Sequence, residues 1–472
     1  MTNSACRITL DEWDVRYEEL RSRGLREPSY GGPLRRHVAD GDLRLLKLRM
    51  DNSAAALRLW NFLLSEEDRL REAHAQGKRL VGAMKDLGTV PVMACSLPNV
   101  VAFCPDGAWW IPCVMETTSR VLAQSDAHGI GESFCPVRAM LGAFLTEDHF
   151  PLPGLLTCSV GATCDDVRAI AQRIQRLGFP ILWWEMPHRR PPEPGEPAVR
   201  LPGGFSAPAS LVAMVRQELG RVREALEHYA GEPLSDARLS EGIARANAVR
   251  RRLAELRRMA YSARLCPMPA LEMLVAEMLA IHFCSDQAEA IEVLDELLEE
   301  VQRRVADRVG VLPADAVRVF WVNPVADLRV MNLLEDVGGR VCGSEYLFCH
   351  ALDPVPEDLP PMEALARMAL ADPMVGSPAD RAGRIAGDAR QFGAEAVVIS
   401  QIPGASHCAM EGAIIEEIVR ERLGLPVVQI EVPPITDALE PTLRTRLEAI
   451  VEASVGRRAA AARPGRLDGS RR

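Results

Sequence analysis

The sequence predicts an α/β fold with two similar open parallel-sheet domains of the flavodoxin-like kind, a helical N-terminal region and a helical connector. Three observations lead to this prediction. Short apolar runs bounded by glycine and proline alternate with helical patterns, as in β–α units. One such unit occurs twice, once in each half of the chain. A length of 472 residues also exceeds what one ordinary core accommodates.

The first half is expected to begin with a helical region over residues 1–87, where apolar residues recur at three-to-four spacing. A first α/β domain is expected over residues 88–204. Its Pro- and Gly-rich end, residues 187–204, is typical of a connector. The predicted buried strands are the runs TVPVMACSL, AWWIPCVM, GLLTCSV and FPILWWEMP.

The second half is expected to start with a helical connector over residues 205–312, followed by a second α/β domain over residues 313–455. In that domain the runs AVRVFWVN, AVVISQIP and VVQIEVP are predicted strands. The tail, residues 456–472, is basic and of low complexity, and we expect it to be disordered.

Composition narrows the class of protein. The chain is 48% hydrophobic and 25% charged, with a formal net charge of −10, which is not the basic footprint of a nucleic-acid-binding protein. No run of about 18 apolar residues predicts a membrane span, and the acidic N-terminus is unlike a signal peptide. We therefore expect a cytoplasmic protein. The sequence has neither a GxGxxG turn nor a P-loop, so no nucleotide site is predicted.

The repeated unit carries a cysteine at the same point in both copies. GLLTCSVGATC leads into a helical pattern in the first copy, and AVVISQIPGASHC does so in the second. In each copy a Gly-x-Pro break, at Gly178 and at Gly424, is expected to end the helix before a second strand. Cys164 and Cys408 therefore fall where a strand gives way to a helix.

This position has a chemical meaning in a parallel sheet. Ligands gather beyond the carboxyl ends of the strands, and a helix N-terminus there favours a thiolate over a thiol. We therefore expect Cys164 and Cys408 to be candidates for a metal site. The alternative is that both are loop cysteines without a role. Cys135, in GIGESFCPVRAMLGAF, also precedes a short helical pattern and joins the candidates.

Three converging thiolates suit a cubane iron–sulfur cluster. A [4Fe–4S] cluster usually takes four cysteines, so three would leave one iron open. A structural zinc site formed by Cys135, Cys164 and Cys408 with His407 is the other metal interpretation. The chain has 12 cysteines and no CxxC pair, and most of them are expected to be small buried core residues.

The motifs around these cysteines resemble those of a known family. CPVRAMLG surrounds Cys135, ATCDDVRAI followed by FPILWWEMP surrounds Cys164, and GLPVVQIEV follows Cys408. RTRLEAIVE, residues 444–452, completes the order. Over roughly residues 90–455 the chain resembles the 2-hydroxyacyl-CoA dehydratase D-component and benzoyl-CoA reductase family of anaerobic metabolism.

The resemblance implies an iron–sulfur enzyme subunit with a [4Fe–4S] cluster held by Cys135, Cys164 and Cys408. It also implies an ATP-dependent iron–sulfur activator protein that delivers one low-potential electron, and a homologous second subunit in a homodimer or heterodimer. The substrate implied is an acyl-CoA thioester. The reaction is radical dehydration by a lyase, or reduction by an oxidoreductase.

The chain departs from the family pattern at Asn99 and Val100, where carboxylates are expected. This departure leaves a second interpretation open, that of a non-catalytic electron-relaying or scaffold subunit of the same complex. A divergent reductase with a larger cluster is a third. The cysteines available for a larger cluster are Cys95, Cys104, Cys113, Cys158, Cys342 and Cys349.

Overall fold

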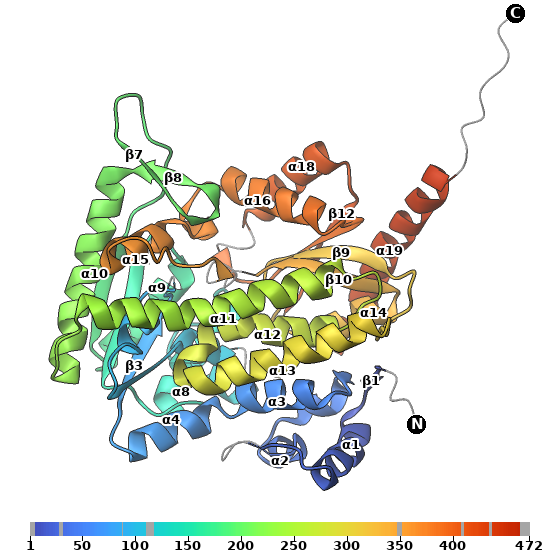
Figure 1. Cartoon of the computed structure of the whole chain (residues 1–472), viewed down its shortest axis with the longest axis horizontal. Helices are drawn as coiled ribbons and strands as arrows, with labels where there is room; N and C mark the ends of the chain where they lie inside the picture. Colours follow the sequence, from blue (N-terminus) through green and yellow to red (C-terminus); the bar gives the residue numbers. More distant parts are fainter. Residues whose placement is uncertain are drawn as a thin grey trace, which may run out of the picture.

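The computed structural model describes residues 5–27, 32–86, 88–109, 118–346, 352–406, 410–433 and 437–462. It confirms the predicted α/β fold. Two four-stranded parallel sheets, together with the helices that pack on them, form the two halves of the molecule (Figure 1).

The two sheets correspond strand for strand. The first has the order β4–β3–β5–β6 and the second the order β10–β9–β11–β12. In chain order each sheet therefore reads 2-1-3-4, the flavodoxin-like arrangement, in which ligands bind between the first and third strands. The strands are β3 (Arg79–Met84), β4 (Val100–Phe103), β5 (Leu155–Gly161), β6 (Ile181–Met186), β9 (Val317–Val322), β10 (Gly339–Glu345), β11 (Ala396–Gln401) and β12 (Val427–Glu431).

The predicted repeat is present as β5–α9–β6 and β11–α18–β12, with α9 spanning Asp165–Arg176 and α18 spanning Gly412–Leu423. Both helices stop at the predicted glycines. Gly178 has φ +102° and Gly424 has φ +62°, left-handed values that glycine adopts without a steric cost.

One predicted strand is wrong. Part of the run TVPVMACSL forms a short helix, α5 (Val90–Ala94). The Asp86 carboxylate starts it by accepting hydrogen bonds from the backbone N–H groups of Thr89 and Val90, at 2.8 Å each. The domain's first strand is instead β3, in residues that the pattern assigns to the helical region. Short apolar runs do not distinguish strand from buried helix, which explains the error.

The run AWWIPCVM is only partly described. Its first two residues belong to a 3₁₀ turn, η2 (Pro105–Trp109), rather than to a strand. The remaining residues of the run, including Cys113, lie outside the described part of the chain.

The predicted helical connector holds both halves together. Its second helix, α11, contacts α5 of the first half and β10 of the second, and α12 contacts α14 (Arg329–Asp336) (Figure 1). The connector helices are α10 (Ala209–Ala230), α11 (Asp236–Ser262), α12 (Ala270–His282) and α13 (Gln287–Ala306). A two-stranded antiparallel pair, β7 (Ala198–Arg200) and β8 (Ser206–Pro208), precedes them.

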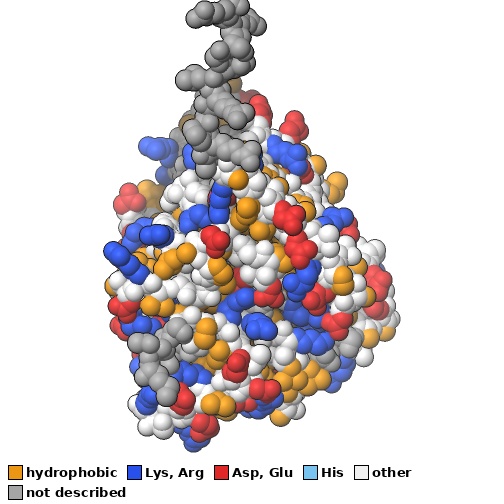
Figure 2. All heavy atoms as spheres, turned by 90° about the vertical axis from the view of Figure 1, so that its right-hand side faces the viewer, with side chains coloured by type: hydrophobic (Ala, Val, Ile, Leu, Met, Phe, Trp, Pro, Cys, Tyr) orange, Lys and Arg blue, Asp and Glu red, His pale blue; other side chains and the backbone are white. Residues whose placement is uncertain are grey.

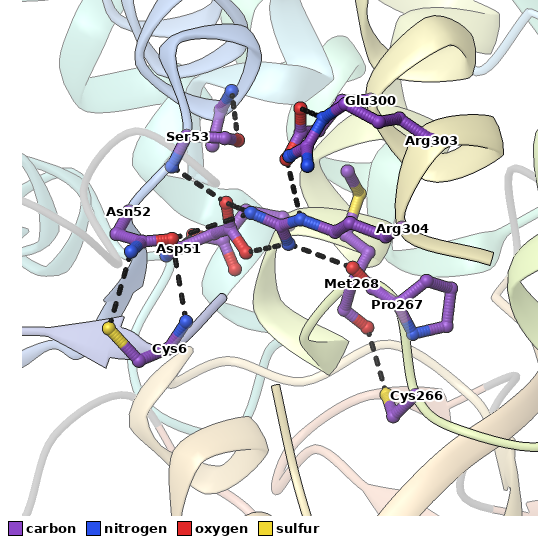
Figure 3. Close-up of polar contacts among 12 residues, drawn as sticks. Cys6, Asp51, Asn52, Ser53, Cys266, Pro267, Met268, Glu300, Arg303 and Arg304 are labelled. Atoms are coloured by element: carbon purple, nitrogen blue, oxygen red, sulfur yellow. Dashed lines mark hydrogen bonds and ion pairs between the residues drawn. The ribbon is translucent and has the colours of Figure 1, made fainter. Parts of the chain in front are cut away.

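The N-terminal region packs on the connector through buried charges. Arg304 of α13, with 1% of its surface exposed, donates to the Asp51 carboxylate at 2.5 and 2.9 Å and to the Pro267 carbonyl oxygen at 2.8 Å (Figure 3). Ser53 N–H donates to the same carboxylate. The elements of this region are β1 (Arg7–Ile8), α1 (Leu10–Ser22), α2 (Arg35–Ala39), β2 (Met50–Asp51), α3 (Ala54–Leu64) and α4 (Glu66–Ala75).

Glu272 of α12 lies beside the Arg304–Asp51 pair, where it accepts from the Asp51 backbone N–H. Its titration makes the stability of the folded protein depend on pH. Burial, and then the charge of Asp51, raises the pKa of Glu272 from 4.5 to about 8. The folded state therefore holds a proton that the unfolded state loses. The stability from this group is complete below pH 4.5 and decreases as the pH rises to about 8, by up to about 1.4 kcal/mol per pH unit.

Replacing Glu272 by glutamine is expected to flatten this pH dependence, because glutamine carries no titrating proton. Denaturant unfolding measured between pH 5 and pH 8 tests it. Glu299→Gln, at an exposed position of α13, is the matched control and should leave the slope unchanged. A slope in Glu272→Gln equal to that of the unsubstituted protein would contradict the assignment.

The remaining elements cover the sheets and close the chain. These elements include α7 (Thr118–Ala127), α8 (Ala139–Thr146), α15 (Pro361–Leu370), α16 (Pro378–Gln391) and α19 (Glu440–Ala462). Residues 456–462, predicted to belong to a disordered tail, continue α19, and residues 463–472 lie outside the described part.

On the face in Figure 2, basic and acidic side chains are intermingled. Among the described helices, none is long and apolar enough to cross a bilayer.

Candidate functional site

Cys164 lies at the carboxyl edge of the first sheet, as predicted. It is the N-cap residue of α9, with φ −123° and ψ 118°, and follows the end of β5 by three residues. Cys135 also sits at a helix start. It is the N-cap of a 3₁₀ turn, Pro136–Arg138, which leads directly into α8. Both cysteines are partly buried.

Cys408 and His407 lie outside the described residues, so the structure gives no contacts for them. The residues just before them are described, and they reach the loops of the other two cysteines. Ser406 donates to the Asp166 carboxylate from its backbone N–H at 2.9 Å and from its hydroxyl at 2.7 Å. Asp166 is in the first turn of α9, two residues after Cys164.

Gly404 lies against the loop that carries Cys135. A Cβ atom built on Gly404 would lie 2.6 Å from the Phe134 carbonyl oxygen and 2.9 Å from that of Glu132. Phe134 directly precedes Cys135. The absence of a side chain at residue 404 therefore lets the second half pack directly on the Cys135 loop. The loops that follow β5 and β11 therefore contact each other, and the loop after β11 also contacts the residues just before Cys135.

A buried ion network holds the other side of the Cys408 segment. Arg381, at the start of α16 and fully buried, donates to Glu411 at 2.7 Å and to the Asn323 side-chain oxygen at 2.6 Å. It also forms an ion pair with Glu345 at 2.5 Å. Asn323 and Glu345 stand at the carboxyl ends of β9 and β10. The network therefore fixes Glu411, three residues after Cys408, to the edge of the second sheet.

The electrostatics of Cys164 differ from the expectation. Burial raises the pKa of this thiol, although the Lys85 charge and the backbone N–H groups of Val167 and Asp166 lower it. The expected effect of the helix N-terminus is present, but burial outweighs it. Cys164 is therefore expected to keep its proton until a metal displaces it.

The donor chemistry of the site fits a thiolate-bound metal group. Cys135 and Cys164 each stand at the start of a helix, on separate loops. Both loops contact the segment that leads to Cys408. Within the described residues, no group of three or more His, Cys, Asp or Glu side chains is arranged to hold a metal ion. Because Cys408 is not among those residues, the three-cysteine site stays a prediction.

The other described cysteines are mostly buried in the core, as predicted. Cys158 is a fully buried residue of β5, and burial raises its pKa. Cys342, in β10, is likewise fully buried, and its pKa is raised to about 12. Cys95 lies against Cys284, whose carbonyl oxygen accepts from the Cys95 thiol at 3.2 Å. Cys349 lies outside the described residues.

Asn99 and Val100 lie at the opposite end of the first sheet. Val100 opens β4 and pairs with Arg79, the first residue of β3. The Asn99 side chain donates to the Ala230 carbonyl oxygen at 3.0 Å. These positions are therefore at the amino edge, and the lack of carboxylates there has no direct bearing on chemistry at the carboxyl edge.

Three buried residues near the site are not among the site residues that the sequence predicts: Lys85, Arg189 and Arg381. Arg189 belongs to the stretch 187–204, which the sequence predicts to be a connector. It is 2% exposed and donates to the carbonyl oxygens of Leu370 and Asp372 at 2.8 and 2.9 Å. Arg189 therefore ties the end of the first domain to the second.

Comparison with known protein families identifies the family to which the chain belongs. The model of the family described as 2-hydroxyglutaryl-CoA dehydratase, D-component, matches residues 94–453, which is more than half of the chain. No curated protein matches. The matched range includes Cys135, Cys164 and Cys408 and both parallel sheets except β3.

Proposed function

Because the chain belongs to the 2-hydroxyglutaryl-CoA dehydratase D-component family, we propose that it is the iron–sulfur subunit of a 2-hydroxyacyl-CoA dehydratase or benzoyl-CoA reductase-like enzyme. It uses one low-potential electron to dehydrate or reduce an acyl-CoA thioester. The observation that carries the proposal is the convergence of the Cys135, Cys164 and Cys408 segments through the Gly404 and Ser406 contacts.

In this proposal Cys135, Cys164 and Cys408 hold a [4Fe–4S] cluster. When bound, such a cluster supplies one-electron chemistry and, with three thiolates, an iron that accepts an oxygen ligand. Residues of the protein hold the segments on both sides of Cys408 in place. Asp166 fixes the segment before Cys408 through Ser406, and Arg381 fixes the segment after it through Glu411.

The substrate is expected to approach the second sheet. A cavity of about 280 Å³ opens beside the carboxyl end of β10, lined in part by Ser344, Glu345, Arg384 and Asp388. Glu345 is shared between this cavity and the Arg381 network. A group bound in the cavity would therefore contact the same carboxylate that holds the site in place.

We also propose two protein partners. An ATP-dependent iron–sulfur activator would deliver the electron, which is consistent with a sequence that has no nucleotide-binding motif. A homologous second subunit, identical or different, would complete the enzyme. Both partners follow from the family.

The test is metal analysis of protein purified without oxygen. The unsubstituted chain is expected to hold about four irons and about four acid-labile sulfides, with a visible spectrum bleached by dithionite. Cys135→Ala, Cys164→Ala and Cys408→Ala are each expected to lose most of this iron. Cys266→Ala is the matched control, because Cys266 is buried between helices with its thiol bonded to the Met268 carbonyl oxygen.

Each other result has a definite meaning. One zinc per chain and no iron would favour the zinc site with His407. About eight irons would indicate a larger cluster. Protein without metal, or equal iron loss in Cys266→Ala and the three site variants, would contradict the proposal. A full cluster with no activity on acyl-CoA in the presence of activator would favour the electron-relaying subunit.

A further inference from the structure

Lys85 is a buried cation at the junction of the two halves. It directly follows β3, has a left-handed φ of 44° and is 9% exposed. Two contacts fix its backbone: its N–H donates to the Asp106 carboxylate at 3.1 Å, and its carbonyl oxygen accepts from the Ser159 hydroxyl. Between β3 and β5, this position is the ligand-binding point of a flavodoxin-like sheet.

The side chain of Lys85 has an unusually weak partner. Among the described residues, its ammonium group makes one polar contact, with the Met374 sulfur at 3.2 Å. Met374 belongs to the second half, in the 3₁₀ turn Pro373–Val375, and is 3% exposed. A thioether is a weak acceptor, so it does not offset the cost of removing an ammonium ion from water.

Two carboxyl groups lie near Lys85, but neither is an ion-pair partner of its ammonium group. Asp106 and Asp86 lie close by, but burial raises the pKa of each. Within the described part of the chain, neither they nor any other carboxylate forms an ion pair with Lys85. Among the residues that the structure describes, this edge therefore holds a buried ammonium group with no carboxylate at ion-pair distance.

The second half shows the contrasting arrangement. The residue equivalent to Lys85 is Asn323, which follows β9 and also has a left-handed φ, 71°. The cation beside it, Arg381, is matched by Glu345 and Glu411. Lys85 thus lies on the Cys164 side of the junction, because β3 pairs with β5, the strand that leads to Cys164, and the Ser159 hydroxyl of β5 donates to the Lys85 carbonyl oxygen. The Lys85 charge also lowers the pKa of the Cys164 thiol.

We propose that Lys85 makes the group held by Cys164 easier to reduce. A one-electron reduction adds one negative charge and breaks or forms no bond to the protein. The fixed ammonium of Lys85, in a site of low dielectric constant, stabilises this added charge more than water would. The proposal rests on the proposed function, because it requires a cluster at Cys164. It assigns Lys85 to the electron-accepting step rather than to the binding of iron.

The test is a redox titration of the anoxically purified holoprotein, followed by electron paramagnetic resonance. Lys85→Met, which removes the charge and keeps the length, is expected to reduce the ratio of reduced to oxidised cluster at least tenfold at a fixed potential. For a one-electron couple this is a midpoint lower by at least about 59 mV. Lys85→Arg keeps the charge and should stay within about threefold of the unsubstituted protein by the same relation.

Lys78→Met is the matched control, since Lys78 is exposed just before the amino end of β3, and its midpoint should not change. An unchanged midpoint in Lys85→Met with full iron would overturn this inference and leave the proposed function intact. Iron-free unsubstituted protein would overturn both. If Lys85→Met does not retain iron, Lys85→Gln repeats the measurement, and an unchanged midpoint there also overturns the inference.

Discussion

Replacing Arg381 by methionine is expected to destabilise the protein by about 3–5 kcal/mol, the usual cost of removing one partner from a buried ion pair. Arg381 is fully buried and forms ion pairs with Glu345 and Glu411. Methionine fills most of the volume but leaves two carboxylates in the interior without their cation. Denaturant unfolding monitored by tryptophan fluorescence measures the loss.

The same substitution is expected to lower the iron content, because Glu411 then loses the contact that fixes the segment following Cys408. Arg390→Met, at an exposed position on the same helix, is the control and should change stability by less than about 0.5 kcal/mol. A loss below about 1 kcal/mol in Arg381→Met, with iron fully retained, would show that the network holds neither the fold nor the site.

Replacing Gly404 by alanine is expected to remove most of the bound iron while leaving the fold intact. The new Cβ would lie 2.6 Å from the Phe134 carbonyl oxygen, and residue 404 has a left-handed φ of +81°. The backbone strain alone costs about 1–3 kcal/mol, and the contact with a backbone oxygen cannot be relieved by a side-chain rotation. The loop must therefore move away from the Cys135 loop.

Gly424→Ala separates the two causes. Gly424 also has a left-handed φ, +62°, but a Cβ there meets no atom within 4 Å. The Gly424→Ala variant therefore has the backbone strain but no steric contact, so the protein should keep its iron. Iron per chain and circular dichroism of both variants decide the matter. Equal iron in the two variants would mean that the Gly404 approach does not position the Cys408 segment.

The local parts of the fold were predictable from the sequence. β5, β6, β9, β11 and β12 are apolar runs with flanking glycine or proline, and the repeated unit predicts that β5 and β6 flank α9 and that β11 and β12 flank α18. The start of the first sheet was not predictable in this way. RLVGAM and TVPVMACSL are both short apolar runs, and only pairing with β4 and β5 makes the first of them a strand.

Cys164 and Cys408 were selected as candidates by their position after predicted strands, and Cys135 by its position before a short helical pattern, but the residues around them were not predicted. The local sequence shows Lys85 only as a lysine in a turn, because its side-chain contact is with Met374, 289 positions later. Arg381 reads as an ordinary charge on an amphipathic helix, because its partners Glu345 and Glu411 come from two other elements. The same holds for the raised pKa of Cys164, since the local helix N-terminus predicts a lower value and burial is a property of the assembled protein.

The contact between Asp166 and Ser406 has a consequence for biosynthesis. It joins residues 240 positions apart, and a ribosome needs on the order of 10 to 50 s to make that length of chain at about 5–20 residues per second. During that time Cys135 and Cys164 have been made but their third candidate partner has not. Under the proposed function, the three cysteines would therefore come together to hold a metal group only after translation of the second half, once both halves have folded against each other.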